Sequence, residues 1–366
     1  MNAERIITMN KTFGEVLKHF DLGVDVAPYG NGHINDTYLV GVPGKFIVQR
    51  VNKVVFPHPE YVMDNIMGVT EFLRKKITEA GGNPDRETLT FVKTKDGKPY
   101  YIDENGDYYR VYKFIDNAIS YTVVEKPEQL YNAAKAFGKF QNMLADYPAN
   151  TLHETIVNFH NTKDRYRQFK EAVAKDASGR GKDVADEIKF VLDREADASI
   201  VVDAIESGKI PLRVTHNDTK LNNVLLDPVT GEGVCVIDLD TVMPGSLLYD
   251  YGDALRFGGS SGAEDEPDLS KIWFDVERFE AFTRGFIEEL PSITDEELKL
   301  LPFSIKLMTL ECGLRFLADY LNGDVYFKTH YADHNLVRCR TQFKLVAEIE
   351  EKMDELNSIV KKLANR

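Results

Sequence analysis

The first third of the chain combines short apolar runs, turn residues and one long helical pattern. Apolar residues recur at helical spacing around residues 13–20 and again over 58–80. The remaining apolar runs are bounded by glycine, proline and asparagine, which is typical of short strands. The expected strands lie at 33–40, 45–51, 88–94, 99–102 and 107–115. These elements predict a compact β-rich unit with one long helix.

Beyond about residue 117 the apolar positions change to helical spacing. Leu130, Phe137 and Leu144 fall on one face of a helix. Further helices are expected near 163–176, 182–207, 271–289, 294–322 and 334–364. Short β-branched runs interrupt these helices within 210–240, where a turn at 228–231 predicts a hairpin.

Together the two patterns predict an α+β fold with two lobes. A small β-rich N-lobe would span residues 1–116, and a larger, mostly helical C-lobe residues 117–366. The total of 366 residues is enough for two such units. No stretch approaches the roughly 18 apolar residues that a membrane span needs. A ligand is expected between the two lobes.

The charge balance excludes some classes of partner. Acidic residues outnumber basic ones, 59 against 45, for a formal net charge of −14. Such a surface repels phosphate backbones and anionic lipids, so nucleic acids and membrane surfaces are poor partners. The three cysteines are widely spaced and form no CxxC pair, which indicates a reducing compartment. Since the N-terminus lacks an apolar signal segment, a cytoplasmic protein is expected.

The strongest chemical signal is the segment from His216 to Asn223, followed by Asp238. Asp218 stands on a loop, Asn223 begins an expected strand, and Asp238 ends the paired strand. Phosphoryl transfer needs a carboxylate beside the attacking hydroxyl and oxygen ligands that hold Mg²⁺ against the phosphates. The hairpin would bring Asn223 and Asp238 to one metal ion. The alternative is an ordinary polar turn and a strand-ending aspartate.

A second signal is the glycine-flanked turn of Gly30, Asn31 and Gly32, with Asn35 and Thr37 in the strand that follows. Glycines let backbone N–H groups approach phosphate oxygens without a Cβ in the way. The turn is not a Walker A loop, since no Gly-Lys-Ser/Thr follows, and not a Rossmann turn, since a strand follows it. A plain hairpin turn is the alternative to a phosphate-covering flap.

The run HNDTKLNN with its downstream Ile-Asp resembles the small-molecule branch of the protein kinase-like superfamily, which includes aminoglycoside, choline and homoserine kinases. The resemblance implies a bilobal protein kinase-like fold with ATP and Mg²⁺ as cofactors. It implies that Asp218 is the catalytic residue, which accepts or orients the attacking hydroxyl. Asn223 and Asp238 would be the metal ligands, and His216 would support the loop.

The same resemblance assigns nucleotide contacts to the N-lobe. Protein kinases carry a lysine on the third strand for the phosphates, and the matching stretch here is FIVQR. Arg50 takes this role because an arginine is always charged and forms bidentate contacts, with Gln49 as the competitor. Tyr112, Phe114 and Ile115 would form the hinge whose backbone binds adenine.

Four other carboxylates are candidates for supporting roles. Asp64 or Glu71 on the long N-lobe helix would pair with the phosphate-binding cation, and spacing does not choose between them. Asp240 lies two residues after Asp238, so an extended strand would turn both toward the metal, and a structural role is the alternative. Asp250 is expected to fix the catalytic loop by hydrogen bonds.

Whole-chain similarity narrows the acceptor. The chain closely resembles bacterial N-acetylhexosamine 1-kinases, which phosphorylate the anomeric hydroxyl of N-acetylglucosamine and N-acetylgalactosamine. The similar stretches are 29–39, 212–240, 243–257 and 311–326. The resemblance implies that Asp218, Arg315 and Tyr326 bind the sugar, with Phe257 and His33 lining its pocket. Packing in the core is the alternative for the two aromatic residues, an ion pair is the alternative for Arg315, and a structural role at the start of the strand is the alternative for His33.

Two other functions stay open. The first is a kinase of the same fold acting on another small hydroxyl acceptor: homoserine, choline, methylthioribose or an aminoglycoside. The second is a catalytically idle kinase-like module, which the presence of Asp218, Asn223 and Asp238 disfavours. The expected partners are ATP and a small sugar. The chain is expected to be a monomer, with a dimer as the alternative.

Overall fold

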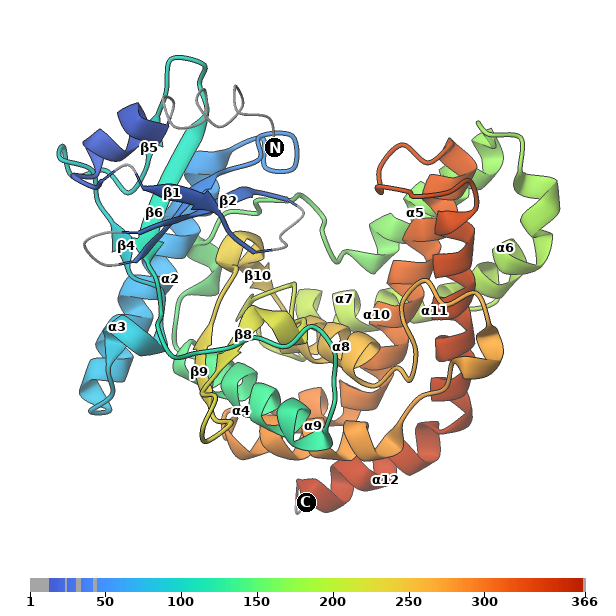
Figure 1. The fold of residues 1–366 in the computed structure, drawn as a ribbon. Helices are drawn as coiled ribbons and strands as arrows, with labels where there is room; N and C mark the ends of the chain where they lie inside the picture. The colour runs from blue at the N-terminus through green and yellow to red at the C-terminus, as the bar shows by residue number, and fades with distance from the viewer. Residues whose placement is uncertain (1–12, 24, 31–33, 42–44, 365–366) are drawn as a thin grey trace.

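The computed structural model describes residues 13–364 apart from 24, 31–33 and 42–44, and it has two lobes (Figure 1). An antiparallel sheet forms most of the smaller N-lobe, and the larger C-lobe is mostly helical, so the predicted α+β bilobal fold is confirmed. The N-lobe strands are β1 (Val26–Pro28), β2 (Asp36–Val40), β3 (Phe46–Arg50), β4 (Phe91–Val92), β5 (Tyr101–Ile102) and β6 (Tyr108–Lys113). They pair in the order β1-β2-β3-β6-β4, and β5 pairs with the first half of β6.

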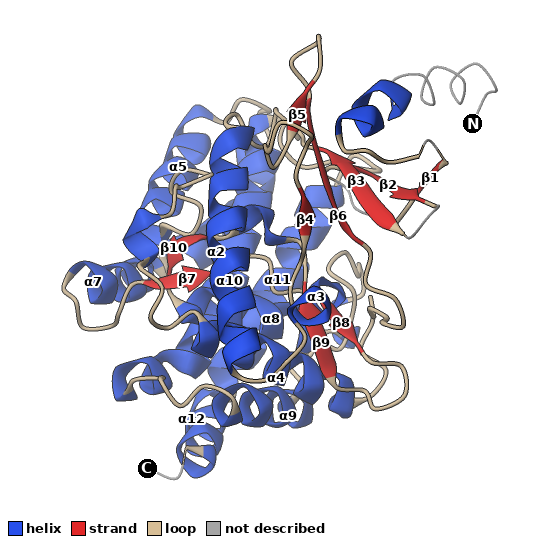
Figure 2. Cartoon of the chain, turned by 90° about the vertical axis from the view of Figure 1, so that its left-hand side faces the viewer, coloured by secondary structure: helices blue, strands red, loops and turns tan. Residues whose placement is uncertain are grey.

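The two faces of this sheet pack against different helices, because side chains alternate along each strand. On one face, a helix of residues 13–19 shares an apolar cluster with Val48 of β3. On the other face lies α2 (Pro59–Glu79), whose Met63 contacts Arg110 of β6. Figure 2 shows the two helices on opposite sides of the strands. The face toward α2 is also the one that meets the C-lobe, since Arg110 forms an ion pair there.

The C-lobe is built from long helices that share apolar cores. The helices of the chain after α2 are α3 (Pro84–Glu87), α4 (Pro127–Met143), α5 (Thr162–Lys175), α6 (Ala185–Leu192), α7 (Ile200–Glu206), α8 (Leu247–Gly258), α9 (Val276–Glu288), α10 (Asp295–Asn322), α11 (His334–Glu351) and α12 (Met353–Leu363). Helix α4 packs along α9, while α10 packs against α5, α8 and α11. A capping box of Thr294 and Glu297 starts α10, and Gly323 ends it in the left-handed conformation.

Two short antiparallel strand pairs carry the loops of the candidate site. β7 (Arg213–Thr215) pairs with β10 (Met243–Gly245), and β8 (Val224–Leu226) pairs with β9 (Gly233–Val236). The pair β8–β9 is the hairpin predicted from the turn at 228–231. The segment 216–223 ends where β8 begins, and Asp238 follows β9. The hairpin therefore brings this segment and Asp238 to the same end of the strand pair.

Helix α8 approaches α10 closely at Gly252. A Cβ at this position would overlap the backbone carbonyl oxygen of Ser304 and lie 2.6 Å from Cγ of Met308. The missing side chain therefore lets the two helices pack against each other. This contact sets the position of α8, which carries Asp250 and Phe257.

Several elements differ from the sequence predictions. Strand β1 is short and ends in a proline, so it carries little strand pattern. The helices expected over 182–207 and 334–364 are each divided in two, as α6 and α7 and as α11 and α12. Helix α8 was not among the expected helices, and 11 of its 12 residues are buried, including the polar residues Asp250, Asp253 and Arg256. Across the described residues, every helix is too short or too polar to span a bilayer.

Candidate active site

The segment expected to carry catalysis is a loop held by Asp250 of α8. The Asp250 carboxylate accepts the backbone N–H groups of His216 at 2.9 Å and Asn217 at 2.7 Å. It also accepts from Nε2 of Gln141 at 2.6 Å. Asn217 has a φ of 65°, in the left-handed region that asparagine tolerates. The prediction that Asp250 fixes the loop by hydrogen bonds is confirmed.

His216 ties the catalytic loop to the segment after β9. Its Nδ1 accepts the backbone N–H of Asp218 at 3.3 Å, and its Nε2 lies 2.8 Å from the carbonyl oxygen of Ile237. Because Nδ1 accepts, Nε2 carries the proton and donates to Ile237. The ring is fully buried and edge-on to Phe137 and Phe140. His216 therefore supports the loop, as the resemblance implies.

Asp218 lies beside both Asn223 and Lys220. Its Oδ2 accepts from Nδ2 of Asn223 at 3.0 Å, and Nζ of Lys220 lies 2.8 Å from Oδ1. Burial acts to lower the pKa of Lys220, but the nearby charge of Asp218 outweighs it and raises that pKa. A cation held beside the catalytic carboxylate can stabilise charge on a transferring phosphoryl group. Lys220 was not among the predicted site residues, although it stands only two residues after Asp218.

Asp238 starts the turn after β9 with a left-handed backbone, φ 60° and ψ 58°. Solvent reaches its side chain, and its carboxylate has no hydrogen-bond partner within the described ranges. Desolvation by the surrounding protein, followed by repulsion from Asp240 and Asp218, raises the pKa of Asp238 to about 6. A carboxylate that is costly to ionise beside other carboxylates is complementary to a cation.

The free atoms of Asn223 and Asp238 fit a divalent cation. Asn223 uses Nδ2 for Asp218, which leaves its Oδ1 without a partner in the part of the chain that the structure describes. Mg²⁺ prefers such hard oxygen ligands and keeps water and substrate phosphates as its other ligands. No group of three His, Cys, Asp or Glu residues in the described chain is arranged to hold a metal. The two residues would therefore hold the ion together with a nucleotide.

Asp240 uses both carboxylate oxygens for contacts with the N-lobe. Its side chain is buried; Oδ2 accepts from Nδ2 of Asn35 at 2.5 Å, and Oδ1 lies 2.5 Å from Nη2 of Arg110. Oδ1 of Asn35 accepts the backbone N–H of Asn52 at 3.0 Å. Of the two roles considered for Asp240, the structural one matches this geometry, because the carboxylate joins the lobes.

The structure does not bring Arg50 to this cluster. Arg50 lies on the sheet face opposite Gln49, where its Nη2 is 2.5 Å from Asp36 and its Nη1 is 3.2 Å from Asp107. Both contacts are exposed to solvent. Because strand alternation turns Arg50 to this face, the geometry gives no support to its predicted contact with the phosphates, for which Gln49 was the competitor.

Gln49 and Arg110 stand together on the face that Arg50 was expected to occupy. Oε1 of Gln49 accepts from Nε and Nη2 of Arg110 at 3.0 and 2.7 Å, and Nε2 of Gln49 donates to Oγ1 of Thr37 at 3.0 Å. A polar chain therefore runs across β2, β3 and β6 to Asp240. Sequence reasoning gave the side chain of Arg110 no role, and β6 offered no distinct signal for it, because the strand also carries Lys113.

The glycine turn is described only in part. Gly30 has a φ of 74°, which favours glycine, and its Cβ position is open. Asn31, Gly32 and His33 lie outside the described residues, so their roles stay predictions. Thr37 lies in β2, the strand that follows the turn, and belongs to the polar chain.

The predicted hinge residues lie where the chain leaves β6. Tyr112 is on the same sheet face as Arg110, and the buried Ile115 packs in the core shared by the lobes. The ring of Phe114 is edge-on to Tyr29, with ring centroids 5.6 Å apart. Since Tyr29 immediately precedes the glycine turn, the hinge and the flap adjoin each other.

The predicted acceptor residues come from three parts of the C-lobe. Nζ of Lys220 lies 5.5 Å from the ring centre of Phe257, which places this ring beside the Asp218 region. Cζ of Arg315 lies 5.9 Å from the ring centre of Tyr326. Tyr326 is 67% exposed, so core packing is excluded for it. Arg315 makes no hydrogen bond or ion pair with any described residue, so the ion-pair alternative finds no support.

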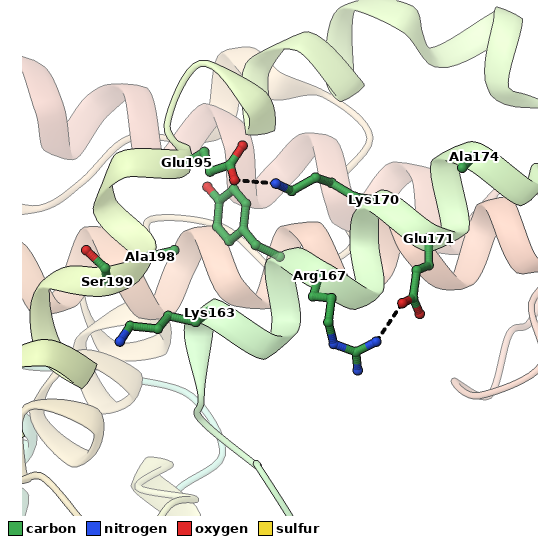
Figure 3. Close-up of a pocket in the computed structure, with 9 residues that line it drawn as sticks. Lys163, Arg167, Lys170, Glu171, Ala174, Glu195, Ala198 and Ser199 are labelled. Atoms are coloured by element: carbon green, nitrogen blue, oxygen red, sulfur yellow. Dashed lines mark hydrogen bonds and ion pairs between the residues drawn. The ribbon is translucent and has the colours of Figure 1, made fainter. Parts of the chain in front are cut away.

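A surface hollow of about 470 Å³ on the C-lobe lies apart from these residues (Figure 3). It is lined by α5 and the segment 195–199. Lys170 pairs with Glu195 and Arg167 with Glu171 inside the hollow, while Lys163 pairs with Asp203 and Glu206 outside it. The hollow contains none of the predicted site residues.

The support that Asp250 gives the loop leads to a stability prediction. Asp250→Ala leaves three buried donors without their acceptor, which is expected to lower the free energy of unfolding by about 3–5 kcal/mol. Urea denaturation measures this change. Asp193→Ala is the matched control, since Asp193 makes only an exposed pair with Lys189 and should cost less than about 1 kcal/mol. Equal losses in the two variants would contradict the role of Asp250.

Solved structures with a similar fold include several small-molecule kinases. A microcompartment-associated aminopropanol kinase is 17% identical, with 96% of this chain and 98% of that chain covered and a TM-score of 0.61. An amicoumacin kinase in complex with AMP-PNP, Ca²⁺ and Ami is 14% identical, with 95% and 96% covered and a TM-score of 0.56. A choline kinase from Cryptosporidium parvum is 15% identical, with 93% of each chain covered and a TM-score of 0.53.

At these identities the structural likeness shows the fold alone. The family follows from the sequence: residues 25–282, more than half of the chain, match the model of the phosphotransferase enzyme family, APH. The matched region includes the glycine turn, the catalytic loop and Asp238. The chain therefore belongs to the phosphotransferase enzyme family and has the fold of its small-molecule kinases.

Proposed function

We propose that this chain transfers the γ-phosphoryl group of ATP to the anomeric hydroxyl of an N-acetylhexosamine, giving the sugar 1-phosphate and ADP. The observation that carries phosphoryl transfer is the meeting of Asp218, Asn223 and Lys220, with Oδ2 and Oδ1 of Asp218 at 3.0 and 2.8 Å from its two neighbours. The metal-ligand candidate Asp238 is close enough for its ionisation to be disfavoured by Asp218. Membership of the phosphotransferase family supports the same chemistry.

Each of these side chains has a part in the proposed transfer. Asp218 accepts the hydrogen bond of the anomeric O–H and holds this oxygen in line with the γ-phosphorus. Asn223 keeps the Asp218 carboxylate in one orientation, and Lys220 faces the charge that develops on the transferring group. Mg²⁺, when held by Asn223 and Asp238, supplies positive charge against the phosphates.

The charges around the acceptor residues favour an uncharged acceptor. Lys220 lies beside Phe257, and burial together with the neighbouring Arg315 lowers the pKa of Arg165, so two arginines share this region. The carboxylates nearby are already paired. Asp253 and Glu264 both pair with Arg256, and Glu311 pairs with His160. A cationic acceptor such as choline or an aminoglycoside would therefore meet repulsion without a free counter-charge.

A sugar suits the uncommitted groups at this site. Arg315 has a planar fork of N–H donors, without a partner among the described residues, for hydroxyl or acetamide oxygens. The exposed ring of Tyr326 offers a face and a phenol. The choice of N-acetylhexosamines among neutral acceptors rests on the resemblance seen in the sequence. His33, predicted to line the same pocket, lies outside the described residues.

An acceptor panel tests this proposal. Purified protein with Mg-ATP is expected to release ADP with N-acetylglucosamine and N-acetylgalactosamine, and phosphorus NMR should identify a sugar 1-phosphate. The matched control is methyl N-acetylglucosaminide, in which the anomeric oxygen is blocked, and no ADP should form. ADP release with choline or homoserine alone would contradict the sugar assignment. ADP release without any acceptor would contradict transfer to a small hydroxyl, and so would the absence of ADP release with every member of the panel.

Arg315→Gln separates acceptor binding from nucleotide binding. The loss of a charged donor to the sugar is expected to raise KM for the sugar by about 10–100-fold and to leave KM for ATP unchanged. Steady-state kinetics with each substrate varied in turn measures both. Arg340→Gln is the control, since Arg340 makes an exposed pair with Glu187. An unchanged sugar KM, or equal effects on both substrates, would remove Arg315 from the acceptor site.

A further inference from the structure

We infer that Arg110 of β6 is the cation through which the N-lobe binds the phosphates of the nucleotide, in the role that the sequence assigns to Arg50. The inference rests on the proposed function only for the nature of the ligand, a nucleotide with a polyphosphate chain, and it is independent of the acceptor. It adds a phosphate-binding residue from the hinge strand.

The sheet register places Arg110 on the face toward the catalytic residues. Arg110 is directly opposite Gln49 in the pairing of β3 with β6, while Arg50 is opposite Tyr109 on the other face. Thr37 and Tyr112 share the face of Arg110. Among the residues that the structure describes in β2, β3 and β6, Arg110 is the only lysine or arginine on this face. A nucleotide bound under the sheet therefore meets this one cation from the strands.

Arg110 is a charged residue in a buried position, which is unusual. The residue is 2% exposed, and an isolated charge in such a position is strongly unfavourable unless it is paired. The carboxylate that pairs with Arg110 is not on α2, where Asp64 and Glu71 were the candidates. Asp64 lies 3.5 Å from His153, and Glu71 lies 3.9 Å from Lys93. Asp240 of the C-lobe supplies the counter-charge.

The guanidinium also has donor capacity that the protein does not use well. Nε and Nη2 of Arg110 donate to Gln49, and Nη2 also faces Asp240. Among the residues that the structure describes, Nη1 has only Sδ of Met63, at 3.9 Å, and a thioether is a weak acceptor. An arginine that keeps strong donors free can take phosphate oxygens, which accept short charge-assisted hydrogen bonds.

Three parts of the expected nucleotide site meet at one carboxylate. Asp240 binds Arg110 of the hinge strand and Asn35, which follows the glycine turn, and it is two residues from the metal-ligand candidate Asp238. Phosphates that lie next to Asp238 would therefore pass close to Arg110. From this position the guanidinium of Arg110 would bind the phosphates, while the predicted hinge residues would bind the adenine ring.

Binding of ADP and adenosine to single variants tests this assignment without turnover. Calorimetry in the presence of EDTA removes metal from the comparison. Arg110→Gln is expected to weaken ADP binding by about 10–100-fold and adenosine binding by less than about 3-fold, because only ADP carries phosphates. Arg110→Lys should lose less ADP affinity, since it keeps the charge. Arg50→Gln is the matched control on the opposite face and should leave both affinities unchanged.

Three results would overturn the inference. They are an unchanged ADP affinity in Arg110→Gln, equal losses of ADP and adenosine, or a selective loss of ADP in Arg50→Gln. The double variant Arg110→Gln/Asp240→Asn removes both charges of the pair, so it provides the same comparison if an unpaired Asp240 prevents folding. If Arg110→Gln selectively loses ADP affinity and the parent protein phosphorylates no sugar, the inference is supported and the proposed acceptor is refuted. Failure of the inference and failure of the proposed function are therefore distinguishable.

Discussion

Asp218→Asn is expected to lower turnover by about 10³-fold, within the range typical of a positioned acid or base, while ATP still binds. The asparagine keeps the shape of the side chain, and its amide oxygen can still accept from Nδ2 of Asn223, 3.0 Å from the present Oδ2. What the variant loses is the negative charge beside the attacking hydroxyl. Asp218→Ala should lose at least as much activity.

Two measurements distinguish this loss from a structural defect. ADP release gives kcat, and calorimetry with an unreactive ATP analogue gives nucleotide affinity, which should stay within about 3-fold of the parent protein. Asp354→Asn on the exposed face of α12 is the control and should keep full activity. Turnover near that of the parent protein in Asp218→Asn would remove Asp218 from the catalytic role.

The residues that sequence analysis located well are those whose partners are close along the chain. Asp218 and Asn223 are five residues apart on one loop, and a single hairpin connects this loop to Asp238. Local spacing and one turn are enough to predict that such groups meet. The hydrogen bonds of Asp250 to the loop also join segments that are close along the chain, because β10 pairs with the strand before the loop and α8 begins shortly after β10.

The contacts between the lobes were not visible in the spacing. Asn35 and Asp240 are 205 positions apart, and their hydrogen bond depends on how the two lobes pack. Arg110 reaches Asp240 from a third segment. No periodicity encodes such a meeting, so Asp240 stayed open between metal binding and structure. Lys220 is a different case, since its position inside the motif was a sufficient signal.

The sequence could not decide between Gln49 and Arg50 for a specific physical reason. Neighbouring strand residues point to opposite faces, so a decision between them requires knowing which face meets the C-lobe. Both faces of β3 are partly buried, by the helix 13–19 on one side and by α2 on the other. The apolar pattern therefore does not mark one face as the inner one, and charge alone favoured Arg50, which lies on the face away from the C-lobe.

Asp238→Asn is expected to lower turnover by about 10³-fold and, in metal-free protein at pH 7.5, to make the fold more stable. The loss of activity follows from the loss of an ionised oxygen ligand for Mg²⁺. The gain in stability follows from relief of repulsion, since desolvation and the charges of Asp240 and Asp218 raise the pKa of Asp238 to about 6. Asparagine tolerates the left-handed backbone of Asp238, so the substitution adds no strain there.

The dependence of this gain on pH has a definite sign. The ordinary pKa is 3.8, so between about pH 4 and pH 6 the folded protein binds the Asp238 proton while the unfolded chain releases it. The free energy of unfolding of the parent protein therefore falls as pH rises through this window. The advantage of Asp238→Asn should be absent below about pH 4 and complete above about pH 6. Urea denaturation in EDTA at pH 4, 5, 6 and 7.5 measures it, with Asp354→Asn as the control. The contrary result is an inactive variant whose stability advantage over the parent protein is no larger at pH 7.5 than at pH 4. It would show that the charges of Asp240 and Asp218 do not disfavour the ionised Asp238.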